Sequence, residues 1–428
     1  MLMANKTEKK YNKTKLDNGL IIVSEYVPYV ESFAAGICVN IGSRNDYKNK
    51  EGIAHFMEHS AFRHTKNRTA KQIANEFENL GAYSNAWTAK DTTCYYVRAI
   101  SHNFNKTFEL LSDISQNTIF IDNEIEKERN IIIEEIKSYE DDPEENILDL
   151  IDSLLFANTS MAHSITGSQN SVSNIQIEDL NTFHNQFYIP NNMLIAVAGN
   201  IEHNHIVQLA EKLFNDNIHK ILPSNNKIKK ATKKTNSANK ELIVSKPIQQ
   251  AHIMLGNIIN KTNTPNELYK LAIANIIFGD GMSSRLYQNL REKYGLAYSI
   301  YSSCQTYIDA CGQINIYVAT DKTNIDKVTD LIYQQMDILN NNKITKKEFQ
   351  RAKEQLKTAT IIDLESMASK VNNIIKHELY FGYREDIDDI IRNIEDISID
   401  DIIDINAKYF TNDNWCKCIL LPDGSVKN

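Results

Sequence analysis

Hydrophobic side chains recur along this chain with two spacings, and the two spacings predict strands and helices in an order that occurs twice. Short apolar runs bounded by turn residues predict strands, and apolar positions three or four apart predict helices. In the first half, the expected strands are 20–27, 33–41, 83–88, 92–100 and 193–197, and the expected helices are 52–62, 69–80, 104–118, 122–139, 144–157 and 203–214. In the second half, the expected strands are 251–256, 296–302 and 313–319, and the expected helices are 266–278, 284–293 and long stretches of 324–409.

The two halves meet at a polar segment, residues 221–241, which holds six lysines and four asparagines. That composition cannot bury a core, so we expect a linker or an exposed loop. A helix-stopping glycine followed by a strand occurs in each half, at Gly81 and at Gly295. This echo indicates duplication. The pattern predicts an α+β fold with sheets covered by helices, divided into domains at 12–220 and 242–428.

Composition is ordinary for a globular protein, with 42% hydrophobic and 24% charged residues among 428. The net charge of -8 gives no general attraction to nucleic acid or to anionic membranes. No apolar run approaches the roughly 20 residues that span a bilayer. The first fifteen residues are polar and rich in lysine, unlike a secretory signal, so a cytoplasmic protein is expected. The six scattered cysteines are expected to be reduced thiols.

Candidate chemistry first appears at His55, Glu58 and His59, which form the pattern H-x-x-E-H within the expected helix 52–62. On a helix, histidines four residues apart project from one face, as two ligands of one zinc ion would. At about 100° per residue, Glu58 lies roughly 60° to one side of His55, where its carboxylate borders the same site. It could there accept a proton from a water that zinc activates. The alternative is a surface helix with two solvated histidines.

A third zinc ligand is expected on another helix, because a catalytic zinc takes three protein ligands and a water. The acidic segment 122–145 offers many carboxylates, and its isoleucines define the helix face that packs inward. Glu134 points almost directly away from that face, toward solvent. Glu128 and Glu135 lie about 20° apart on the flank of the face, two turns apart. One could bind zinc while the other holds a ligand by a hydrogen bond, or both could be ordinary carboxylates at the helix boundary.

Short segments spread over the whole chain resemble one family. The segments are Gly42–Arg44, Glu51–His59, Arg68–Ala70, Asn85–Thr88, Glu128–Ile136, Tyr188–Met193, Ala198–Asn200, Ser284–Tyr287 and Leu290–Ser299. Together they resemble the pitrilysin/insulinase family of zinc peptidases, especially the branch of the mitochondrial processing peptidase and its bacterial relatives. The resemblance implies two homologous half-domains, each a mostly antiparallel sheet covered by helices.

The resemblance also assigns roles in a metal site. It implies that His55, His59 and Glu135 hold one Zn²⁺ ion per chain. It implies that Glu58 is the general base and then the proton donor to the leaving amine. Glu128 matches the family's supporting acid, which would orient a ligand of the metal.

Further residues match positions that contact the substrate. Asn85 and Ala86 are expected on an edge strand beside the metal, where an extended peptide could bind by main-chain pairing. Arg291 and Tyr298 match an arginine and a tyrosine that contact the substrate backbone, and Gly295 would stop the helix between them. Both side chains can donate hydrogen bonds to a carbonyl or an oxyanion. The alternative is an exposed helix arginine and a packed strand tyrosine.

Some positions depart from the family pattern. Ser60 stands where an apolar residue is usual, and Arg63-His64 replaces a usual Lys-Gly. These departures put local packing or substrate preference in doubt more than catalysis. His64 is off the face of His59 and is expected to be solvated.

The sequence therefore predicts a zinc-dependent endopeptidase that hydrolyses peptides or unfolded polypeptide segments enclosed between two half-domains. The chain corresponds to one half of the family's enclosing assembly, so a homodimer is expected, with a heterodimer possible. The first alternative is a non-catalytic or scaffold subunit of a heterodimeric peptidase, which loss of a ligand or of Glu58 would mark. The second is a structural zinc protein, which would need four protein ligands.

Overall fold

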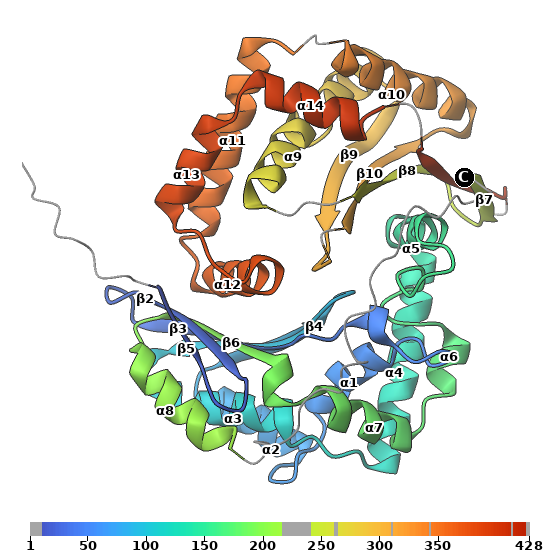
Figure 1. The fold of residues 1–428 in the computed structure, drawn as a ribbon. Helices are drawn as coiled ribbons and strands as arrows, with labels where there is room; N and C mark the ends of the chain where they lie inside the picture. Colours follow the sequence, from blue (N-terminus) through green and yellow to red (C-terminus); the bar gives the residue numbers. More distant parts are fainter. Residues whose placement is uncertain are drawn as a thin grey trace, which may run out of the picture. The chain divides into compact units, whose positions relative to one another are not determined.

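The computed structural model describes residues 11–215, 241–260, 264–309, 311–341, 344–411 and 414–424 (Figure 1). These residues form two compact units. Unit 1 contains the described residues up to 136, residues 163–215 and residues 363–382, and unit 2 contains residues 137–162 and the rest of the second half. No helix of the described residues is both long and apolar enough to cross a membrane.

Unit 1 is built on a six-stranded sheet with the order β1-β2-β6-β3-β5-β4. The strands are β1 Tyr11–Lys15, β2 Ile21–Tyr26, β3 Ser32–Val39, β4 Tyr83–Thr88, β5 Thr93–Ile100 and β6 Met193–Gly199. Only β2 and β6 pair in parallel, and all the other neighbours are antiparallel. β4 lies at one edge of the sheet, with one side of its backbone unpaired in the described part of the chain.

The central strands of this sheet are apolar on both faces because helices cover both faces. Seven of the eight residues of β3 are buried, and so is every residue of β6, as expected for strands between two layers. Figure 1 shows α12 (Met367–Phe381) on one face and α3 (Phe104–Gln116) with α8 (His203–Leu213) on the other. Val371, Ile374 and Ile375 of α12 pack against the sheet.

Unit 2 repeats this arrangement with five strands in the order β7-β11-β8-β10-β9. The strands are β7 Glu241–Lys246, β8 Ala251–Asn260, β9 Ala297–Thr306, β10 Cys311–Thr320 and β11 Cys416–Pro422. The order β7-β11-β8-β10-β9 is the order β2-β6-β3-β5-β4 of unit 1 with five added to each strand number. As in unit 1, one pair of strands is parallel, here β7 and β11, and the others are antiparallel. Gly81 and Gly295 both have positive φ, at 60° and 61°. The expected fold of two related mostly antiparallel sheets is confirmed.

The remaining helices include most of those expected from the sequence. They are α1 Ile53–Ala61, α2 Ala70–Asn79, α4 Asp122–Asp141, α5 Pro143–Leu155, α6 Gln169–Ser173, α7 Ile177–Phe187, α9 Pro265–Phe278, α10 Ile325–Asn340, α11 Lys346–Asp363, α13 Ile387–Asp396 and α14 Ile399–Tyr409. The expected helix 284–293 is largely a π-helix, Tyr287–Lys293. The chain also contains α6, α7, β1 and β7, which the apolar pattern did not predict.

Two helices pack in the unit that is built mainly from the other half of the chain. α5 comes from the first half, yet Ile147, Ile151 and Leu155 pack with Met254 and other side chains of unit 2. α12 comes from the second half and packs in unit 1. These contacts do not follow the expected division at residues 221–241. Residues 221–240 lie outside the described residues, and residue 241 begins β7.

Candidate metal centre

The start of α1 is fixed by one buried carboxylate. Asp46 accepts hydrogen bonds from the backbone N–H of Gly52 at 2.6 Å and of Ala54 at 3.1 Å. The Gly52 backbone is in the left-handed region at φ 95°, and a Cβ there would lie 2.4 Å from the carbonyl oxygen of Thr166. Only glycine fits this close approach. The helix that carries the H-x-x-E-H motif is thus set in one position.

Apolar residues of α1 hold the two histidines beside each other at the edge of the core. Phe56 and Met57 are fully buried in the core of unit 1. His55 is 7% exposed, and its ring centre lies 4.6 Å from that of His59. Both rings therefore project from one face, as the spacing of four predicts.

α4 brings a carboxylate to the two histidines. Its buried isoleucines, including Ile132, pack into the core, which turns Glu135 toward α1 and leaves Glu134 exposed. An Oε2 atom of Glu135 lies 3.8 Å from Nε2 of His55 and 3.4 Å from Nε2 of His59. One possible ligand atom from each of the three residues lies within 4.8 Å of the others.

These three side chains fit a catalytic zinc ion. Two imidazole nitrogens and one carboxylate oxygen are a ligand set that catalytic zinc takes, and they leave a fourth position for water or substrate. Among the described residues, His55, His59 and Glu135 are the group of histidine, cysteine or acidic side chains with this geometry. A structural site with four protein ligands is not formed by this group.

Glu128 lies on the other side of His59. Its Oε2 is 3.0 Å from Nδ1 of His59, and its side chain is 2% exposed. An ionised carboxylate only accepts hydrogen bonds, so Nδ1 donates and Nε2 is left to face Glu135. Arg63 forms an ion pair with the other oxygen of Glu128. The sequence reasoning missed this contact, although Arg63 lies four residues after His59, in the same register as the two histidines.

The pKa values of the two histidines move in opposite directions. Burial, followed by the neighbouring His59, lowers the pKa of His55 to about 4. Burial also acts to lower the pKa of His59, but hydrogen bonds to Glu128 and Glu135 outweigh it and raise that pKa to about 9. Burial raises the pKa of Glu58, and a hydrogen bond from Thr88 opposes the increase.

Glu58 is tied to the edge strand of the sheet. The hydroxyl of Thr88 donates to Oε2 of Glu58 at 2.6 Å, so the carboxylate is held beside the end of β4. Earlier in the same strand, Asn85 is exposed, and Ala86 packs against the core. Alternate residues of β4 thus face opposite sides of the sheet.

A buried ion pair fixes the loop that follows Thr88. Arg44 is fully buried and pairs with Asp91, and the backbone N–H of Ser43 donates to the carbonyl of Ala89 at 3.0 Å. A Cβ on Gly42 would lie 2.3 Å from that same carbonyl oxygen. The segment Gly42–Arg44 therefore supports the hairpin that carries Thr88.

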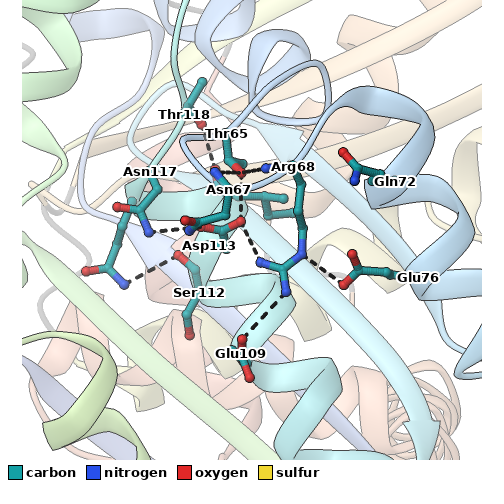
Figure 2. Close-up of polar contacts among 12 residues, drawn as sticks. Thr65, Asn67, Arg68, Gln72, Glu76, Glu109, Ser112, Asp113, Asn117 and Thr118 are labelled. Atoms are coloured by element: carbon teal, nitrogen blue, oxygen red, sulfur yellow. Dashed lines mark hydrogen bonds and ion pairs between the residues drawn. The ribbon is translucent and has the colours of Figure 1, made fainter.

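A second polar network fixes the segment that follows α1 (Figure 2). Asp113 of α3 accepts hydrogen bonds at 2.7 to 2.9 Å from Thr65, Asn67, Arg68 and Asn117. The carboxylate is buried, and each of its oxygens accepts two of these bonds. This network positions residues 65–68 without touching the metal ligands.

Arg291 and Tyr298 lie next to each other in unit 2. The guanidinium of Arg291 lies 5.3 Å from the ring centre of Tyr298 and 4.9 Å from that of Tyr287. Tyr298 is 77% exposed, so it is not the packed strand tyrosine of the alternative interpretation. The two residues belong to unit 2, whereas the histidines and Glu135 belong to unit 1.

Comparison with known proteins agrees with the fold. A family profile described as Insulinase (Peptidase family M16) matches residues 21–169, and one described as Peptidase M16 inactive domain matches residues 174–356. All the candidate metal ligands lie in the first of these segments.

Two similar proteins match nearly the full chain. One of Bacillus subtilis (strain 168), named Uncharacterized zinc protease YmxG, is 33% identical over 412 residues, which cover 96% of this chain and 98% of that protein. One of Rickettsia felis, named Uncharacterized zinc protease, is 35% identical over 408 residues, covering 95% of this chain and 96% of that protein.

Solved structures share the fold. A protease from Helicobacter pylori has a TM-score of 0.89 at 22% identity, covering 96% of this chain and 100% of that chain. A putative M16-like peptidase from Alicyclobacillus acidocaldarius has a TM-score of 0.85 at 21% identity, covering 96% and 98%. At these identities the structures establish the fold alone. Together with the full-length relatives and the family profiles, they show that this chain belongs to the insulinase family of peptidases, family M16.

Proposed function

We propose that this protein is a zinc-dependent endopeptidase that hydrolyses peptides or unfolded polypeptide segments. The observation that carries the proposal is the convergence of His55, His59 and Glu135, with Glu58 beside them on the same helix. This combination supplies a metal site with an open position and a carboxylate to move protons. Relatives named as zinc proteases support the same assignment.

In the proposed mechanism, the zinc supplies Lewis-acid polarisation of the scissile carbonyl and lowers the pKa of a water. Glu58 accepts a proton from the attacking water and delivers it to the leaving amine. Thr88 holds one oxygen of Glu58, so the carboxylate is oriented before substrate arrives. Glu128 keeps Nδ1 of His59 engaged and Nε2 directed to the metal.

Substrate binding is proposed to use the edge strand β4. An extended peptide can pair with its free backbone edge near Asn85 and Ala86, which gives affinity with little demand on sequence. A folded protein offers no free strand, so unfolded segments are the expected substrates. Arg291 and Tyr298 are proposed to donate hydrogen bonds to the substrate backbone or the oxyanion. We also propose that two chains form a homodimer that encloses the peptide.

Metal analysis and peptide cleavage on the purified protein test this function. We expect about one zinc per chain and cleavage of an unstructured fluorogenic peptide. A chelator should abolish cleavage, and added zinc should restore it. Bound zinc without cleavage of any peptide in a broad library would rule out the enzyme.

One single variant and one matched pair of variants separate the roles. Glu58→Gln should keep zinc and lose cleavage, because it removes the proton acceptor but no ligand. Glu135→Gln should lose zinc, whereas Glu134→Gln should keep it, because the side chain of Glu134 is exposed. Zinc loss in Glu134→Gln with retention in Glu135→Gln would refute the ligand assignment.

The alternative is a non-catalytic subunit of a heterodimeric peptidase. The profile described as an inactive domain matches residues 174–356, and none of the candidate ligands lies in that range. Light scattering on the purified protein should give the mass of a dimer of this chain. Cleavage that appears only after addition of a different subunit would favour the heterodimer.

A further inference from the structure

Arg63 lies at the candidate metal centre but has no role in the proposed mechanism. It follows the last turn of α1, where its backbone N–H donates to the carbonyl of Ser60 at 3.0 Å. Its guanidinium forms an ion pair with Oε1 of Glu128, while Oε2 of the same carboxylate faces Nδ1 of His59 at 3.0 Å. Glu128 therefore bridges an arginine and a candidate zinc ligand.

The burial of Glu128 explains why this arginine matters. The side chain of Glu128 is 2% exposed, whereas that of Arg63 is 34% exposed. A buried carboxylate needs a countercharge or several hydrogen-bond donors to stay ionised and in one orientation. Its two oxygens have separate partners, Arg63 for Oε1 and His59 for Oε2. Loss of Arg63 would leave the carboxylate with a single orienting partner.

We propose that Arg63 is a positioning residue for the metal site, which fixes Glu128 so that His59 presents Nε2 to zinc. The proposal rests on the zinc site of the proposed function. Partners that orient a histidine ligand typically change metal affinity about 10- to 100-fold when they are removed. Here Glu128 orients His59, and Arg63 in turn orients Glu128. The effect of Arg63 on zinc affinity should therefore depend on Glu128.

A second acid near Arg63 supplies a contrast. Glu124 lies one turn before Glu128 in α4, and the charge of Arg63 contributes to lowering its pKa, after the larger effect of a hydrogen bond from Lys127. Glu124 contacts no candidate zinc ligand in any described interaction. Glu124→Gln removes a carboxylate near Arg63 that touches no candidate ligand, so it should keep the wild-type zinc affinity; a loss as large as that of Arg63→Met would mean that the charge near Arg63 matters and not its contact with Glu128.

The test measures the dissociation constant for zinc by competition with a chromophoric chelator, so it needs no peptidase activity. We expect Arg63→Met to weaken zinc binding about 10-fold or more, and Arg63→Lys to recover most of the loss because it keeps the charge. Arg68→Met is the matched control, because Arg68 also pairs with a buried carboxylate, Asp113. It should lower thermal stability and keep the wild-type zinc affinity.

A double-mutant cycle separates positioning from general destabilisation. Arg63→Met should weaken zinc binding no further when Glu128 is already Gln. An equal loss in both backgrounds, or wild-type affinity in Arg63→Met, would overturn the role of Arg63 and leave the proposed function intact. Wild-type protein that binds no zinc would overturn the proposed function as well. Arg63→Lys is the folding control: if Arg63→Met is poorly folded, the zinc affinity of Arg63→Lys still tests the role of the charge.

Discussion

Replacement of Asp113 by asparagine should destabilise unit 1 far more than its small change in shape suggests. Each carboxylate oxygen of Asp113 accepts two hydrogen bonds, Oδ1 from Asn67 and Asn117 and Oδ2 from Thr65 and Arg68. An asparagine amide presents an NH₂ group to one of these donor pairs, so two bonds are lost or rearranged.

The magnitude follows from the burial of the network. Asp113 is 4% exposed, and loss of one partner of a buried ion pair typically costs about 3–5 kcal/mol. The asparagine oxygen retains some acceptor capacity, so we expect Asp113→Asn to lower the free energy of unfolding by about 3 kcal/mol. Glu109 is the control, because it contacts the same arginine, Arg68, at 3.5 Å with a side chain that is 54% exposed. Glu109→Gln should cost less than about 1 kcal/mol.

Urea unfolding followed by tryptophan fluorescence measures this difference. The chain has two tryptophans, one in each unit, and Trp415→Phe leaves Trp87 of β4 as the reporter of unit 1. Both variants are compared in that background. A loss below about 1 kcal/mol for Asp113→Asn, or an equal loss for Glu109→Gln, would refute the reasoning.

The difference in unfolding free energy between wild type and Asp113→Asn should depend on pH in a defined way. Burial acts to raise the pKa of Asp113, but the hydrogen bonds from Thr65, Arg68, Asn117 and Asn67 outweigh it and hold the pKa below its ordinary value. A carboxyl group with a depressed folded pKa contributes stability above its unfolded pKa of about 3.9 and loses it as pH falls through the folded value. The gap between wild type and Asp113→Asn should therefore stay constant from neutral pH to about pH 5 and shrink below about pH 4.

Three further substitutions test interactions inside one unit or the other. Ile132→Ala removes a fully buried side chain of α4 and should lower the free energy of unfolding by about 2–5 kcal/mol in urea titration; a loss below about 1 kcal/mol would contradict its burial. Gly42→Ala places a Cβ 2.3 Å from the carbonyl oxygen of Ala89 and should cost about 1–3 kcal/mol, whereas unchanged stability would mean that the loop yields freely. In unit 2, burial acts to raise the pKa of Asp401, but hydrogen bonding to Lys270 lowers it to about 2. Lys270→Met should therefore cost up to about 1 kcal/mol at neutral pH and progressively less as pH falls from about 4 to 2, and a cost that grows in acid would show the opposite linkage.

Helical periodicity predicted much of the candidate site because its residues lie on two amphipathic helices. The spacing of four places His55 and His59 on one face of α1, and the apolar stripe of α4 distinguishes Glu135, beside the histidines, from the exposed Glu134. Periodicity alone did not choose between Glu128 and Glu135. Their different partners depend on how α1 and α4 pack, which is tertiary information.

Other features depend on contacts that no local pattern records. Arg63 continues the four-residue register of the two histidines past the end of α1, but only the fold brings Glu128 to it. The π-helix Tyr287–Lys293 has the same apolar spacing in its sequence as a short α-helix. β1 and β7 are edge strands without a buried residue. β1 is polar apart from Tyr11, and β7 has only the short apolar run Leu242–Val244, so neither sequence shows the apolar alternation of a half-buried strand.

The placement of α12 has a consequence for how the chain folds during synthesis. The last strand of the unit 1 sheet ends at Gly199, yet Val371 and Ile375, which cover one face of that sheet, follow roughly 170 residues later. Ala34 and Leu194 are among the buried residues of that face. At about 5–20 residues per second, synthesis of α12 follows that of the sheet by on the order of 10 s or longer. During this interval the ribosome-bound chain exposes the apolar face that α12 later covers. We expect chaperones to bind the nascent chain at this stage, because they bind exposed apolar surface.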